Sequence, residues 1–104
     1  MATGVLAQVA PAATTYTLVY TSNTTAAVSI NFLNRDSVAV TARIAVGTIA
    51  NNSSPATTNF IEYDVSIPAN GVIERTGLVL NTGQKIVVYA STANTTVSVY
   101  GIET

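Results

Sequence analysis

The sequence predicts an all-β protein, a single-domain antiparallel β-sandwich of seven to eight strands with a jelly-roll-like plan. Two observations predict this fold class. Apolar and polar residues alternate with period two through most of the 104 residues, as in strands that have one buried and one exposed face. Turn-forming residues interrupt these runs at short and regular intervals, which is typical of sandwiches and jelly rolls.

The alternating runs and the turns between them locate seven strands. We expect these strands at residues 16–21, 28–32, 38–46, 61–67, 71–80, 84–91 and 95–103. A longer loop, at residues 48–59, joins the third strand to the fourth. Residues 1–14 are small and weakly patterned, so we expect an N-terminal arm there and the β-sandwich domain over residues 15–104.

The segment IEYDVSIPANGVIERT, which begins at Ile61, holds four of the nine charged residues of the chain. Its Pro-Ala-Asn-Gly sequence is the strongest turn signal, because Asn and Gly tolerate positive φ. We therefore interpret the segment as a hairpin whose apolar residues, Tyr63 among them, face a core. The other face then holds the charged side chains, namely Glu62, Asp64 and either Glu74 or Arg75.

The charge content argues against several kinds of partner. Only 9% of the residues are charged, and the net charge is −1 with four basic residues. Phosphate neutralisation needs clustered Lys and Arg, so we expect no nucleic acid partner and no binding to an anionic membrane surface. No apolar run approaches the ~18 residues that span a bilayer.

The residue types that most catalysis and metal binding require are missing. The chain has no Cys and no His, and thus lacks a thiol nucleophile and the commonest general base and metal ligand. Glu62 and Asp64 could act as an acid–base pair or bind a hard cation, but charges on the exposed face of a strand are the simpler interpretation. No nucleophile elbow, P-loop or dinucleotide-binding motif is present. We expect neither an enzyme nor a bound metal or cofactor.

The charged residues are candidates for subunit contacts. Arg75 could pair with Asp64 or Glu62 across the hairpin, which would add about 0.2–1 kcal/mol, or with a neighbouring subunit, where such pairs set specificity. Glu74 is adjacent to Arg75 and points to the opposite face. Arg43 is on the outward face of its strand, and Arg is enriched at interface hot spots. A solvated charge is the equal alternative for Arg43.

Several strands are apolar on both faces, which a small sandwich with one interior cannot bury by itself. Residues 77–80 and 86–90 are the clearest cases. Neighbouring subunits are the expected cover, so we favour a homo-oligomer, a trimer, over a monomer with scattered exposed apolar residues. The second run includes Tyr89, which we assign to the subunit interface because tyrosine combines a large apolar body with a hydrogen-bonding tip.

Three segments resemble small virion proteins of tailed bacteriophages, above all those of phages that infect cyanobacteria: FIEYDVSIPANGVIERTGLVL, GQKIVVYAS and the ending VSVYGIE. The opening MATGVLAQ and the segment SINFLNRDSVAVTARIAVGT fit the same pattern, so the resemblance covers nearly the whole chain. The resemblance implies an all-β structural subunit of a capsid or a tail. It implies no catalytic residues.

On this resemblance we expect a capsid decoration, or cement, protein that is assembled in the host cytoplasm and becomes part of the virion. Such a protein binds the major capsid protein in the assembled head and stabilises it. Two alternatives stay open. One is a tail, collar or fibre-associated component, and the other is a host-glycan-binding module that uses the polar loop at residues 51–58.

Overall fold

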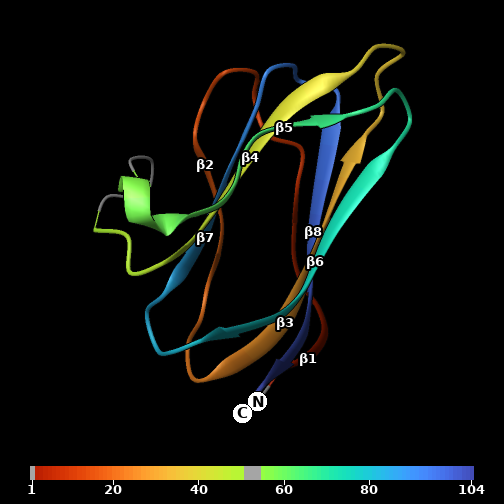
Figure 1. Cartoon of the computed structure of the whole chain (residues 1–104). Coiled ribbons are helices and arrows are strands. Elements are labelled where there is room, and N and C mark those ends of the chain that lie inside the picture. The colour runs from red at the N-terminus through yellow and green to blue at the C-terminus, as the bar shows by residue number, and fades with distance from the viewer. Residues whose placement is uncertain (1, 51–54) are drawn as a thin grey trace.

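A computed structural model describes residues 2–50 and 55–104 and shows an all-β chain (Figure 1). In chain order, the elements of the described residues are β1 (Thr3–Val9), β2 (Thr17–Thr21), β3 (Ala26–Asn34), β4 (Val40–Gly47), the short 3-10 helix η1 (Thr57–Asn59), β5 (Phe60–Ile67), β6 (Val72–Leu80), β7 (Lys85–Ala90) and β8 (Thr95–Glu103). All seven expected strands are present, and β1 is an eighth. The predicted fold class, an antiparallel β-sandwich, is confirmed.

The strands form two four-stranded antiparallel sheets, sheet A with the order β1-β8-β3-β6 and sheet B with the order β2-β7-β4-β5. Figure 1 shows the two sheets as facing layers. The chain passes from one sheet to the other at every connection except the one between β4 and β5. The pairs β1–β8, β2–β7, β3–β6 and β4–β5 are all hydrogen-bonded. The first half of the chain therefore pairs with the second half like one long hairpin that has been rolled up.

The core lies between the two sheets, because the inward positions of the strands are apolar. β3 alternates strictly, with Val28, Ile30 and Phe32 buried and the residues between them more exposed. Sheet B contributes Ile44 and Val88 to the same cluster. Burying one such side chain contributes about 1.5–3 kcal/mol, so this cluster holds the sheets together.

β1 shows that the first residues do not form the expected arm. Thr3–Val9 pairs with β8 along the edge of sheet A, and Leu6 and Val9 pack against the core. Its small residues and a register shift between Val5 and Ala7 obscure the alternation in the sequence. Pairing with β8 and burial of a few side chains are nevertheless sufficient to place an edge strand.

β5 and β6 do not pair, so the predicted hairpin is wrong. β5 is an edge of sheet B and β6 is an edge of sheet A, and the connection between them crosses from one layer to the other at the upper right of Figure 1. The turn itself is present. Asn70 has a φ of 59°, and the N–H of Gly71 donates to the carbonyl of Pro68 at 2.8 Å. The residues predict a turn, but they do not specify which strands pair.

Asn34 fixes the loops at this end of the sandwich. Its side chain is fully buried at the end of β3, and its Nδ2 donates to the carbonyls of Val38, Ile67 and Pro68 at 2.9, 3.0 and 3.1 Å. Its Oδ1 accepts from the backbone N–H of Asp36 at 2.8 Å. One amide thus connects sheet A, the loop between β3 and β4, and the end of β5.

Candidate functional site

The candidate site begins with a β-bulge in β5. The register between β4 and β5 shifts here, so that two residues of β5, Tyr63 and Asp64, oppose the single residue Arg43. Asp64 takes a φ of 53°, a left-handed conformation that Asp tolerates better than most residues. A bulge re-aims side chains, and Tyr63 is 58% exposed and contacts Arg43. The prediction that Tyr63 faces the core is therefore wrong.

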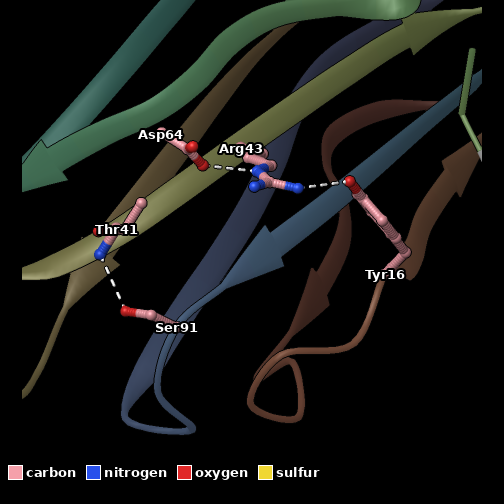
Figure 2. Close-up of polar contacts among 5 residues, drawn as sticks. All are labelled: Tyr16, Thr41, Arg43, Asp64 and Ser91. Carbon is pink, nitrogen blue, oxygen red and sulfur yellow. Dashed lines mark hydrogen bonds and ion pairs between the residues drawn. The ribbon is translucent and has the colours of Figure 1, made fainter. Parts of the chain in front are cut away.

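Arg43 lies on the outer face of sheet B, where two hydrogen bonds fix its guanidinium. Nε donates to Oδ1 of Asp64 at 2.6 Å, and Nη1 donates to the hydroxyl of Tyr16 at 2.8 Å. Figure 2 shows the guanidinium between these two oxygens, which come from β5 and from the segment before β2. The hydrogen bond to Asp64 and then the one to Tyr16 raise the pKa of Arg43 above its ordinary value. The cation is thus held in one place and compensated by a carboxylate.

Three tyrosines contact this guanidinium, and Phe60 packs against two of their rings. Its Cζ lies 4.3 Å from the ring centroid of Tyr63 and 4.7 Å from that of Tyr89, within the range of cation–π contacts. Tyr89 is directly opposite Arg43 in the β4–β7 pairing. The ring centroid of Tyr16 lies 5.2 Å from that of Tyr89 and 6.1 Å from that of Phe60. We define the Arg43 cluster as Tyr16, Arg43, Phe60, Tyr63, Asp64 and Tyr89.

A hollow of about 360 Å³ lies beside the Arg43 cluster and is lined by Thr57, Phe60 and Tyr63. Thr57 belongs to η1, which Figure 1 shows outside sheet B, on the side away from sheet A. Beneath this segment Ile49 and Val87 are buried in a second small core, against which Phe60 packs. One wall of the hollow is thus anchored to the sheet.

The charges at the sandwich edge are paired within the chain. Nε of Arg75 lies 2.6 Å from Oε2 of Glu62, and Nη2 of Arg75 donates to the carbonyl of Ile61 at 3.2 Å. The predicted partner of Arg75 is confirmed, but the predicted geometry is not, because the two residues belong to edge strands of different sheets. The ion pair joins the two layers at one edge of the sandwich, and Glu62 does not share a face with Asp64 as expected.

Glu74 lies on the outer face of sheet A, where its Oε2 accepts from the hydroxyl of Tyr100 at 2.8 Å. This hydrogen bond raises the pKa of Tyr100 above its ordinary value. The structure thus separates the six predicted interface residues. Three are in the Arg43 cluster, two pair at the sandwich edge, and Glu74 is on the opposite face. Their contact with another subunit stays a prediction.

The aromatic part of the site escaped the sequence analysis. We expected Tyr63 in the core and Tyr89 at a subunit interface, so nothing in the sequence predicted that the two rings lie on either side of Arg43. Only the order of strands in sheet B brings Tyr16 and Tyr89 beside Tyr63. The available signal was the outward position of Arg43, which identifies the centre of the cluster but not the rings around it.

No family model, curated protein or solved structure matches this chain. Within residues 2–50 and 55–104, no three His, Cys, Asp or Glu side chains gather as a metal site would require. No helix in that part of the chain has the length and apolar character needed to cross a membrane. Half of the loop considered for glycan binding, residues 51–54, lies outside the described residues. Thr57, in the other half of that loop, lines the hollow beside the Arg43 cluster.

Proposed function

We propose that this protein is a structural virion protein of a tailed phage, and within that class a capsid decoration protein that binds the assembled head. The resemblance of the sequence motivates the class. The fold supports it, because pairing of the chain as one rolled-up hairpin is the plan of an eight-stranded jelly roll, an architecture found in viral capsid proteins. The strongest support is an exposed apolar row on the outer face of sheet A.

This apolar row crosses all four strands of sheet A. Ile102 of β8 pairs with Thr3 of β1 and with Ala27 of β3, and Ala27 pairs in turn with Val79 of β6. Directly opposite residues share one face of a sheet. Val79 is 70% exposed and Ile102 46%, and Val5 beside them is 63% exposed. Together, Val5, Ala27, Val79 and Ile102 make up the apolar row.

We assign the apolar row to contact between copies of the chain in a homo-oligomer, a trimer. Burying one Val or Ile side chain contributes about 1.5–3 kcal/mol. The net charge of −1 leaves little repulsion between copies. An oligomer that binds only the assembled shell stabilises the shell by mass action, which is the mechanism proposed for the decoration role.

Light scattering on the purified protein tests the oligomer. We expect three times the mass of one chain. Val79→Asp should give the mass of one chain. A carboxylate buried between copies would lose its hydration without gaining a hydrogen-bond partner. Val38→Asp is the matched control, since Val38 is an exposed valine in the loop between β3 and β4. A wild-type protein with the mass of one chain would contradict the homo-oligomer. An equal loss of mass in Val79→Asp and Val38→Asp would show that the apolar row is not the contact between copies.

Electron microscopy of virions labelled with an antibody to this chain tests the location. Label over the heads is the expected result. Label confined to the tails would contradict the decoration role and would favour a tail, collar or fibre-associated subunit. Purified heads that lack the protein should also regain heat stability when the protein is added back.

A further inference from the structure

The hollow beside the Arg43 cluster has the character of a small-ligand site. Its volume of about 360 Å³ is at the lower end of the range of ligand pockets, about 300–1,000 Å³. The rings of Phe60 and Tyr63 meet almost at a right angle, with centroids 5.0 Å apart and 81° between their planes. More than half of Tyr63 is exposed, so two aromatic walls are available to a ligand.

Arg43 holds one of these walls in position. Its guanidinium lies 4.3 Å from the ring centroid of Tyr63, and it is itself fixed by Asp64 and Tyr16. A ring supported in this way has lost conformational freedom before a ligand arrives. Binding therefore costs less side-chain entropy than it would at a free surface tyrosine.

The two charged groups of the Arg43 cluster, which lies beside the hollow, have no net charge together. Asp64 compensates Arg43, and its side chain is still 47% exposed. Oδ1 of this carboxylate pairs with Arg43, and a carboxylate oxygen accepts hydrogen bonds from hydroxyl groups. Thr57 adds a hydroxyl to the lining. The hollow thus combines two aromatic walls with the hydroxyl of Thr57, and the carboxylate of Asp64 follows Tyr63 directly in β5.

We propose that this hollow binds a neutral saccharide. A pyranose has an apolar C–H face that packs on an aromatic ring, and a rim of hydroxyls that donate to a carboxylate. An acidic sugar or a phosphate is disfavoured, because Asp64 is beside the hollow and Arg43 is already paired. This site goes beyond the proposed virion role and does not depend on it.

Titration of ¹⁵N-labelled protein with maltotriose, cellotriose and triacetylchitotriose, followed through amide chemical shifts, tests the site. About 20 mM sugar nearly saturates a site with a Kd of about 1 mM. At least one of the three sugars should shift the amides of Thr57, Phe60 and Tyr63 and leave that of Ile102, on the other sheet, in place. Trigalacturonic acid, an anionic probe, should bind at least about tenfold more weakly.

Tyr63→Ala removes one wall and should weaken binding at least about tenfold. Tyr100→Ala is the matched control, because Tyr100 lies on the outer face of sheet A and its loss should leave the affinity unchanged. Absence of shifts with all three sugars, or equal binding by Tyr63→Ala and the wild type, overturns the proposal. If no sugar binds and Tyr63→Ala detaches the protein from heads, the hollow receives a side chain of a capsid protein instead.

Discussion

Arg43 and Asp64 meet at 2.6 Å because β5 has one more residue than β4 at this level. In a regular ladder, alternation would send either Tyr63 or Asp64 to the core face. The bulge turns both toward Arg43, with a positive φ at Asp64 that costs about 1–2 kcal/mol in a residue other than glycine. The ion pair and the contact with Tyr63 offset this strain, so the bulge and the Arg43 cluster stabilise each other.

Replacement of Arg43 tests this mutual dependence. Arg43→Ala leaves Asp64 unpaired and removes the contacts with Tyr63 and Tyr89, so we expect a Tm lower by about 4–8 °C and a weaker near-ultraviolet circular dichroism signal from the tyrosines. Arg43→Lys should lie in between, because an ammonium keeps the charge but lacks the planar fork that also reaches Tyr16. Calorimetry and circular dichroism measure both effects. An unchanged Tm with an unchanged tyrosine signal would contradict a rigid cluster.

Loss of the buried amide of Asn34 should be the more severe change. Asn34→Ala removes the two N–H donors that three carbonyls share and one accepted hydrogen bond at a position with no exposed surface. We expect a loss of about 3 kcal/mol in the free energy of unfolding. Asn94→Ala is the control. Its side chain is exposed and donates to Asp36 at 3.3 Å, so we expect about 0.5 kcal/mol or less. Urea unfolding that gives equal losses would refute the role of Asn34.

The sequence predicts the strands well because each strand is encoded locally. The alternation of Val28, Ile30 and Phe32 with polar residues is sufficient to place β3, and the Asn70-Gly71 pair is sufficient to place a turn. Strand pairing is not encoded locally. Whether β6 joins β5 or β3 depends on how both sheets bury their apolar faces together, and no property of the turn decides it.

The candidate site is less predictable than the fold, because the Arg43 cluster depends on the β-bulge in β5. The bulge in β5 reverses the faces expected for Tyr63 and Glu62. Val65 and Ile67, which follow the bulge, contact the core as expected. The outward position of Arg43 could be predicted, since β4 is regular at that residue. The neighbours of Arg43 come from three other parts of the chain, and only the order of strands brings them together.

Tyr20 gives the stability of the fold a dependence on alkaline pH. It lies on β2 and donates to the carboxylate of Glu103 on β8, across the two sheets. Burial first, and then the hydrogen bond to Glu103, raise the pKa of Tyr20 well above its ordinary value of 10.0. Above pH 10 the unfolded chain releases this proton while the folded chain keeps it. Its contribution to stability is therefore complete below that pH and is lost as the pH rises toward the folded pKa.

The variant Tyr20→Phe separates this effect from general alkaline unfolding. Below pH 10 we expect the variant to be less stable by about 1–3 kcal/mol, because Glu103 keeps its buried position without the hydroxyl. Above pH 10 the Tm of the wild type should fall more steeply than that of the variant, which has no proton to release at this site. Parallel curves for the two proteins between neutral pH and pH 12 would show that Tyr20 is not the group responsible.

Gly101 should be the least replaceable glycine of sheet A, because the backbone of β3 occupies the space that a side chain would need there. A Cβ at this position would lie 2.1 Å from the carbonyl oxygen of Ala27 and 2.8 Å from Cα of Val28. Both atoms are backbone, so they cannot move without breaking the β3–β8 pairing. We expect Gly101→Ala to lower the free energy of unfolding by about 3 kcal/mol or more, or to prevent folding.

Gly77→Ala separates this steric effect from backbone strain. Both glycines have a positive φ, +154° at Gly101 and +71° at Gly77, but a Cβ at Gly77 would meet no atom within 4 Å. Gly77→Ala should lower the free energy of unfolding by about 1–2 kcal/mol, because a left-handed conformation is strained in a residue other than glycine. If urea unfolding gave equal losses at the two positions, the backbone conformation rather than the close approach of β3 would explain why glycine is needed at residue 101.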